Sequence, residues 1–175
     1  MDKTLFFRES QDYFGCMEGV VNSPLFHKDI PTLAKKCEEV YIRRCIQYFE
    51  SFHNESRAVL EQLLRATKAY LIDLLEEYED EFDLGEDFSF DDDSDPNEVL
   101  TLIKPEQLVF EKLGVLTDED APPVFALKLC FAPVPDQTIE WVVRDGQVIY
   151  VGEYRGVSPW NEKLAKKKWN YINRL

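Results

Sequence analysis

The stretch TIEWVVRDGQVIYVG, residues 138–152, decides how this chain folds. Two runs of β-branched and aromatic residues flank Asp145-Gly146, a dipeptide that favours a two-residue type I′ turn. That turn places three pairs of residues opposite one another: Val143 with Val148, Val142 with Ile149, and Trp141 with Tyr150. Both faces of the hairpin are then apolar near its turn, so we expect it inside an antiparallel sheet and not at an edge.

Other apolar runs punctuated by proline and glycine surround this hairpin. QLVFEKLGVL (107–116) and PPVFALKLCFAP (122–133) precede it and predict strands. At the start of the chain, TLFFRES (4–10) and DYFGCMEGVV (12–21) are each followed by turn-forming residues. The first 30 residues therefore favour β structure or extended chain.

Between these regions the apolar period is that of a helix. One stripe at helical spacing consists of Cys37, Tyr41, Cys45, Tyr48 and Phe52. A second and longer stripe consists of Leu60, Leu64, Thr67, Leu71, Leu74 and Tyr78, widened by Leu63 and Leu75. The first helix begins at Pro31 or Thr32, unless DIPTL (29–33) is a short strand, and Asn54 or Ser56 can cap the second. Their short link predicts an antiparallel helix pair.

The last residues, SPWNEKLAKKKWNYINRL (158–175), predict a short amphipathic helix with a basic outer face, because Trp160, Leu164, Tyr171 and Leu175 recur at helical spacing. Helices and strands are segregated along the chain and do not alternate. We therefore expect an α+β fold: a small antiparallel sheet with the helix pair packed against it and a short C-terminal helix. A chain of 175 residues, 45% of them hydrophobic, predicts one domain spanning 1–175.

The formal net charge of −14 comes from one segment. Of the 34 acidic residues, 14 lie between Asp73 and Glu98, and the other 20 equal the 20 Lys and Arg in number. No Lys or Arg lies between Lys68 and Lys104. Such a field repels nucleic acid and anionic membranes and attracts cations and basic proteins. We therefore expect neither nucleic acid nor a membrane as a partner.

Motifs of catalysis and cofactor binding are absent from the sequence. It contains no nucleophile elbow, P-loop or dinucleotide fingerprint, and His27 and His53 stand outside any metal-binding spacing. An EF-hand loop begun at Asp91 has Pro96 where glycine is needed, and one begun at Asp87 has an aspartate there. We expect no metal, no cofactor and no catalysis.

Four cysteines, Cys16, Cys37, Cys45 and Cys130, form no CxxC pair, and the N-terminus lacks the features of a signal peptide. No apolar run is long enough to span a membrane. We expect a cytosolic protein with reduced thiols, in which Cys37 and Cys45 share a face as small buried hydrophobes.

Four aromatic rings are threaded through the acidic segment: Tyr78, Phe82, Phe88 and Phe90. Rings either pin such a segment to the protein or offer apolar anchors to a partner, with the carboxylates as a charged surround. We expect an acidic loop at about 79–98 that binds a protein, although a solvated loop serving only solubility is the alternative. The candidate partner-binding residues are Glu76, Glu79, Asp80, Glu81, Phe82, Asp83, Glu86, Asp87, Phe88, Phe90, Asp91, Asp92, Asp93 and Asp95. Exposed residues of EYRGVSPW (153–160) are a candidate second contact.

Three stretches together carry a resemblance: CEEVYIRRCIQYFESFHNESRAVLEQLLRATKAYLIDL (37–74), ALKLCF (126–131) and IEWVVRDGQVIYVGEYRGVSPWNE (139–162). In this order they resemble a family of small bacterial cytosolic toxin-immunity proteins, which have an N-terminal strand region, two helices, an acidic linker and a C-terminal sheet ending in a DGxVxxVG hairpin. The resemblance covers about Phe7 to Trp160. The chain departs from it at FAPVPDQTIEW (131–141), where only Asp136 remains of an acidic run found in relatives.

The resemblance implies a protein that binds and neutralises a cognate toxin delivered by a neighbouring cell. Many such toxins are nucleases with a basic face, so the expected partner is a basic toxin domain. Two other functions remain open from the residues alone. One is an enzyme that uses a carboxylate pair in a sheet-side pocket near Trp141 and Tyr150, and the other is an adaptor for a basic cellular protein or peptide.

Overall fold

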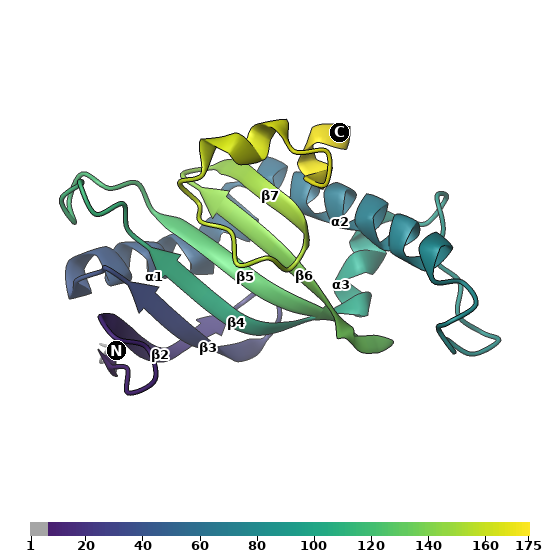
Figure 1. Ribbon diagram of the computed structural model, residues 1–175, viewed down its shortest axis with the longest axis horizontal. Helices are drawn as coiled ribbons and strands as arrows, with labels where there is room; N and C mark the ends of the chain where they lie inside the picture. Colours follow the sequence, from purple (N-terminus) through teal and green to yellow (C-terminus); the bar gives the residue numbers. More distant parts are fainter. Residues whose placement is uncertain (1–6) are drawn as a thin grey trace.

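The computed structural model describes residues 7–175 and is built on a seven-stranded sheet (Figure 1). The strands lie in the sheet in chain order: β1 Arg8–Glu9, β2 Cys16–Ser23, β3 Lys28–Lys35, β4 Ile103–Glu111, β5 Val124–Phe131, β6 Val134–Arg144 and β7 Gln147–Glu153. All neighbours are antiparallel except β3 and β4, which are parallel because the helices cross over between them. The predicted α+β fold is confirmed. Of the strand predicted at 4–10, residues 4–6 lie outside the described residues.

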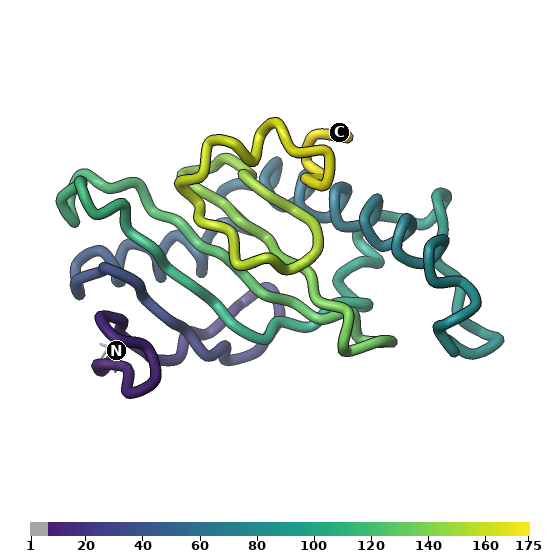
Figure 2. Tube along the Cα trace, viewed as in Figure 1, coloured from purple at the N-terminus to yellow at the C-terminus, as the bar shows by residue number. Residues whose placement is uncertain are grey.

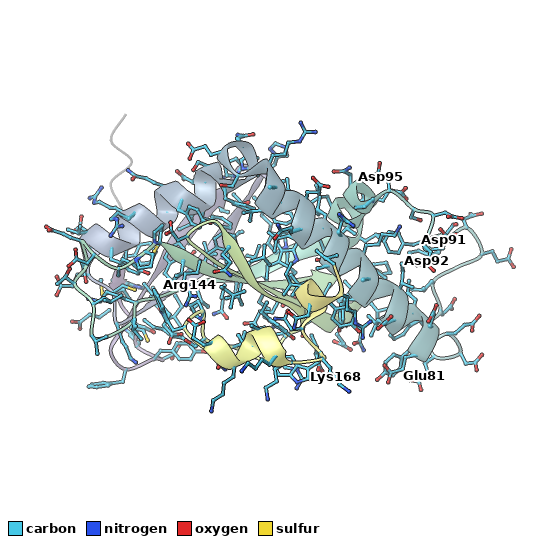
Figure 3. The ribbon with its side chains drawn as sticks, turned by 90° about the horizontal axis from the view of Figure 1, so that it is seen from above. Glu81, Asp91, Asp92, Asp95, Arg144 and Lys168 are labelled. Carbon is cyan, nitrogen blue, oxygen red and sulfur yellow. The ribbon has the colours of Figure 1, made fainter. Side chains whose placement is uncertain are left out.

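Two helices, α1 (Glu39–Glu55) and α2 (Arg57–Glu77), cover one face of the sheet (Figure 1). They meet at Ser56, whose side chain makes no capping hydrogen bond. The two helices follow one another along the long axis of the molecule in both views (Figures 1 and 3). The expected side-by-side antiparallel arrangement is therefore wrong, because a one-residue link is too short to reverse the chain. DIPTL lies in strand β3 and does not open α1.

The core lies between these helices and the sheet. Phe49 and Phe52 of α1 pack on Phe125 of β5. Their ring centroids lie 5.1 and 4.9 Å, respectively, from the ring centroid of Phe125. The predicted α2 stripe points inward: Leu63, Leu64, Thr67, Leu71 and Leu74 are buried, and Leu60, Leu75 and Tyr78 are partly buried. Thr67, the polar member of that stripe, accepts a hydrogen bond from Trp141 Nε1 at 2.7 Å.

The β6–β7 hairpin turns at Asp145 and Gly146, with φ of 46° and 76°, as a type I′ turn requires. Val143 pairs with Val148 as expected, but a bulge then shifts the register, so the other two expected pairs are wrong. Val142 pairs with Tyr150, and Trp141 pairs with Val151. The shift turns Tyr150 away from the helices, and its hydroxyl donates to the carbonyl of Glu153 at 2.6 Å.

Strand β7 lies at the edge of the sheet, so the hairpin is not internal as we expected. The chain beyond it crosses the sheet face that the helices leave open (Figure 2). It ends in the short helical segment that we predicted, which consists of two 3₁₀ helices, η2 (Glu162–Lys166) and η3 (Tyr171–Arg174), and not of one continuous amphipathic helix. Between them, fully buried Asn170 accepts the N–H of Val151 at 3.2 Å and donates to the carbonyl of Ile149 at 2.8 Å. Its amide thus replaces a neighbouring strand at this edge.

Candidate functional site

The acidic segment, residues 73–98, begins in the last turns of α2 and forms the end of the molecule farthest from the β1–β2 turn (Figures 1 and 2). After α2 the chain runs through a series of turns to η1 (Pro96–Glu98). The short α3 (Val99–Leu102) then leads it into β4. The segment therefore connects the helical layer to the middle of the sheet.

Thirteen of its 14 acidic residues are exposed, and Asp73 alone is half-buried. All of the predicted carboxylate contacts belong to the exposed set: Glu76, Glu79, Asp80, Glu81, Asp83, Glu86, Asp87, Asp91, Asp92, Asp93 and Asp95. Figure 3 shows that the labelled members of this set, from Glu81 to Asp95, are spread around this end of the molecule. A partner approaching this end therefore meets negative charge from several directions.

The chain's own bases leave this charge uncompensated. Lys68, the last base before the segment, donates its ammonium hydrogens to the backbone carbonyls of Asp92 and Ser94, both at 2.5 Å, and not to a carboxylate. The C-terminal Arg174 pairs with Asp73. Within residues 7–175, no Lys or Arg forms an ion pair with a carboxylate from Glu76 to Glu98.

Two of the candidate carboxylates also hold the segment's own turns. Asp91 Oδ1 accepts the N–H groups of Asp93 and Ser94 at 2.9 and 3.1 Å. Asp95 caps η1 by accepting the N–H of Asn97 at 2.8 Å, a hydrogen bond that lowers the pKa of Asp95. The segment thus has a defined conformation. Carboxylates such as Glu79, which accepts no such hydrogen bond from residues 7–175, are the better candidates for partner contacts.

The four rings of the segment pack on the protein body to different degrees. Phe90 is buried, whereas Tyr78, Phe82 and Phe88 are half-buried. Tyr78 and Phe82 stack with centroids 5.4 Å apart, and Phe88 meets the core ring of Phe131 edge-on at 6.3 Å. The rings therefore pin the segment, and three of them keep part of their surface accessible.

These rings lie in an open groove of about 800 Å³ between the end of α2 and the returning chain at 82–92. Its apolar lining consists of Ile72, Leu75, Tyr78, Phe82, Leu84, Phe88 and Phe90. Its acidic lining consists of Glu76, Glu79, Asp83, Glu86, Asp91 and Asp92.

The sequence reasoning missed Ile72, Leu75, Leu84 and Lys68 as parts of this site. The isolated leucine at 84, inside an acidic run, was the available signal.

The pocket near Trp141 and Tyr150, which the enzymatic alternative requires, is not formed within residues 7–175. Trp141 packs in the core below the helices and Tyr150 lies on the opposite face, so they share no pocket. Near them, buried Glu140 accepts the N–H groups of Arg155 and Val157 at 3.0 and 3.3 Å. Burial raises the pKa of Glu140, and these backbone hydrogen bonds oppose the increase. The adjoining cavity of about 30 Å³ has room for one water and not for a substrate.

The thiols and the metal-ligand residue types give no sign of a reactive centre. Burial raises the pKa of Cys37 to about 12 and that of Cys45 to about 11, so neither thiol is poised as a thiolate. Within residues 7–175, no three His, Cys, Asp or Glu side chains are grouped so that they could hold a metal ion. In that same part of the chain, no helix is long and apolar enough to cross a membrane.

The candidate second contact, EYRGVSPW, lies on the sheet face that carries the C-terminal segment. Tyr154 is exposed there, and Arg155 stacks on Trp169, 4.7 Å from the ring centroid. Trp160 is half-buried and donates its indole N–H to the carbonyl of Glu111 at 2.7 Å. This stretch is thus mainly used to fasten the C-terminal segment, and it lies apart from the groove.

A family model described as a domain of unknown function (DUF6985) matches residues 6–158. The match spans the sheet, both helices and the acidic segment. No curated protein and no solved structure matches the chain.

Proposed function

This chain belongs to the DUF6985 family of domains of unknown function. We propose that it is an immunity-type binding protein. It neutralises a cognate bacterial toxin in the cytoplasm by covering the toxin's basic face with the acidic segment. The toxin is a basic domain, in the most specific form of the proposal a nuclease.

The observation that carries the proposal is uncompensated charge on a folded scaffold. Thirteen exposed carboxylates surround one end of the molecule, and none from Glu76 to Glu98 is paired with a base within residues 7–175. Like charges held together destabilise a folded protein through repulsion, and a basic partner removes that repulsion. Attraction of this kind accelerates association by about 10- to 1,000-fold at low salt.

The acidic segment inhibits a nuclease by presenting carboxylates to the basic side chains that bind its substrate. A nuclease binds the phosphates of its substrate with Lys and Arg side chains, and the salt-dependent phosphate contacts dominate its affinity. Carboxylates placed on those side chains compete with phosphate for the same cations. The accessible parts of Tyr78, Phe82 and Phe88 add apolar contacts that slow dissociation, because buried aromatic anchors carry much of the energy of protein interfaces.

The immunity role is supported by the order of elements described for the sequence, from the N-terminal strands to the DGxVxxVG hairpin. An adaptor for a basic cellular protein would use the same acidic segment, so genetic context separates the two functions. A toxin gene beside this chain's own gene favours the immunity role, and the decisive experiment co-expresses the chain with the protein that the neighbouring gene encodes. We expect the cells to survive and the two proteins to co-purify; death of the cells despite folded protein would refute the immunity role.

The docking surface is tested with charge-neutralising variants. We expect a variant carrying Glu79→Gln, Asp80→Asn, Glu81→Gln and Asp83→Asn to associate about tenfold more slowly at low salt, with a flatter salt dependence. These four positions avoid Asp91 and Asp95, which hold the segment's turns.

The matched control neutralises four exposed acids elsewhere, Asp12, Glu61, Glu119 and Asp136, and so changes the net charge equally. It should retain most of the association rate. Equal slowing in both variants would mean that overall charge, and not the acidic segment, brings the partner in.

A further inference from the structure

The groove in the acidic segment combines two properties that a purely electrostatic surface lacks. We propose that it receives arginine side chains of the partner, in preference to lysine. This inference rests on the proposed function, because it specifies which basic side chains the acidic segment recognises. The groove holds about 800 Å³, enough for several side chains of one partner segment.

The shape of the groove suits a side chain with an apolar stem and a cationic head. Its floor is formed by the half-buried Leu75, Phe82 and Phe88, and carboxylates such as those of Glu79 and Asp83 line the same space. Lys and Arg bury their methylene stems along apolar surface while the charged head reaches polar groups. Apolar floor and acidic rim are thus complementary to one basic side chain at the same time.

Arginine is favoured because the floor contains aromatic faces. The stacked rings of Tyr78 and Phe82, 5.4 Å apart, are half-exposed beside the carboxylates. A guanidinium is planar and weakly hydrated, so it stacks on a ring and still donates two hydrogen bonds to a carboxylate. An ammonium is compact and strongly hydrated, so it loses more solvation when it approaches a ring.

The protein contains this arrangement once already, at the start of the acidic segment. The guanidinium of Arg174 lies 4.1 Å from the centroid of the Tyr171 ring and bonds to the carboxylate of Asp73. Tyr171 donates its hydroxyl hydrogen to the same carboxylate at 2.7 Å. Arginine, ring and carboxylate thus meet at Asp73 as we infer for the groove, where Phe82 would take the place of Tyr171.

The test compares two synthetic peptides of equal length and charge, tetra-arginine and tetra-lysine, by calorimetric titration of the full chain at physiological salt. We expect the arginine peptide to bind about three- to tenfold more tightly, as one or two cation–π contacts imply. Phe82→Leu, which keeps an apolar side chain but removes the aromatic face, should abolish this preference while leaving lysine-peptide binding unchanged. Phe14→Leu is the matched control, since Phe14 is fully exposed between β1 and β2 and outside the groove, and it should retain the preference.

Equal affinities of the two peptides for the unaltered protein would overturn the inference, and this comparison requires no variant to fold. An arginine preference that persists in Phe82→Leu would also overturn it, because the preference would then not come from the aromatic face of Phe82. Neither result bears on toxin neutralisation, which the co-expression experiment decides. If protection fails while the arginine preference is found and depends on Phe82, the groove recognises a basic partner other than a toxin.

Discussion

The hydroxyl of Thr67 lies between two fully buried groups. It accepts the indole N–H of Trp141 at 2.7 Å and donates to the carbonyl of Leu63 at 2.7 Å. Thr67→Val keeps the shape of the side chain but leaves the indole N–H buried without an acceptor, so we expect a loss of about 1–3 kcal/mol in the free energy of unfolding. Denaturant titration measures this loss.

Thr67→Ser is the control for that prediction, since it retains the hydroxyl and removes one methyl group. The indole N–H resonance of Trp141 should keep its hydrogen-bonded chemical shift in Thr67→Ser and move in Thr67→Val. If the resonance stayed in place in Thr67→Val, the hydrogen bond to Thr67 would not exist in solution.

Glu140 gives the protein a pH-dependent element of stability. Because burial raises the pKa of this carboxyl in the folded state above its unfolded value, the folded protein binds a proton more readily over the interval between the two values. Ionised Glu140 therefore reduces stability above its folded pKa, and this loss is recovered as pH falls through that pKa towards the ordinary value of 4.5. We expect unfolding free energies measured from pH 7 down to about 4.5 to improve for the unaltered protein relative to Glu140→Gln. A difference that is constant with pH, or that changes in the opposite direction, would contradict this role.

At the scale of elements, strand β7 depends on Asn170 for the completion of its edge. Asn170→Ala removes the acceptor of the Val151 N–H and the donor to the Ile149 carbonyl, so we expect a loss of about 2–4 kcal/mol in unfolding free energy. Hydrogen exchange should show a large decrease in protection at the Val151 amide. Asn173→Ala is the control, because Asn173 is exposed and bonds the Lys167 carbonyl outside the sheet. If protection of the Val151 amide against hydrogen exchange were unchanged in Asn170→Ala, the side-chain amide of Asn170 would not replace the hydrogen bonds of a neighbouring strand.

Element type was predictable from local pattern, whereas arrangement was not. Asp145-Gly146 determined the turn of the β6–β7 hairpin, because the positive φ angles that this turn requires depend only on these two residues. The bulge that follows the turn pairs Val142 with Tyr150 in place of Ile149, and no local residue pattern marks that position. In the same way, the apolar stripe predicted α2, but the direction of α1 relative to α2 depends on a link of one residue at Ser56.

The candidate site was predictable in composition but not in shape. Charge and rings in the sequence identified residues 76–98, and the structure leaves those carboxylates exposed as expected. The groove itself requires Ile72 and Leu75 of α2 to face the returning chain at Leu84, and Lys68 to hold that chain by its carbonyls. These residues of α2 lie nine or more positions from Leu84, in no periodic pattern, so composition alone does not reveal that they come together.

At the scale of the whole molecule, the excess charge is concentrated at one end. The rest of the chain has equal numbers of acidic and basic residues, so repulsion acts mainly among the exposed carboxylates of the acidic segment. This repulsion opposes folding and is screened by salt over about 8–10 Å at physiological ionic strength. The free protein should therefore become more stable as salt is added at low ionic strength.

We expect the variant with Glu79, Asp80, Glu81 and Asp83 neutralised to melt about 2–4 °C above the unaltered protein at low salt, since a modest free-energy gain gives a shift of this size. Its melting temperature should also depend less on sodium chloride. The control variant at Asp12, Glu61, Glu119 and Asp136 changes the net charge equally but lies outside the acidic segment, so its melting temperature should rise less.

Calorimetric melting of the three proteins between low and physiological salt tests this prediction. Equal shifts in both variants would mean that the charge acts through its total and not through its position. A lower melting temperature in the first variant would show that those carboxylates stabilise the fold, and the acidic segment would then need no partner to explain it.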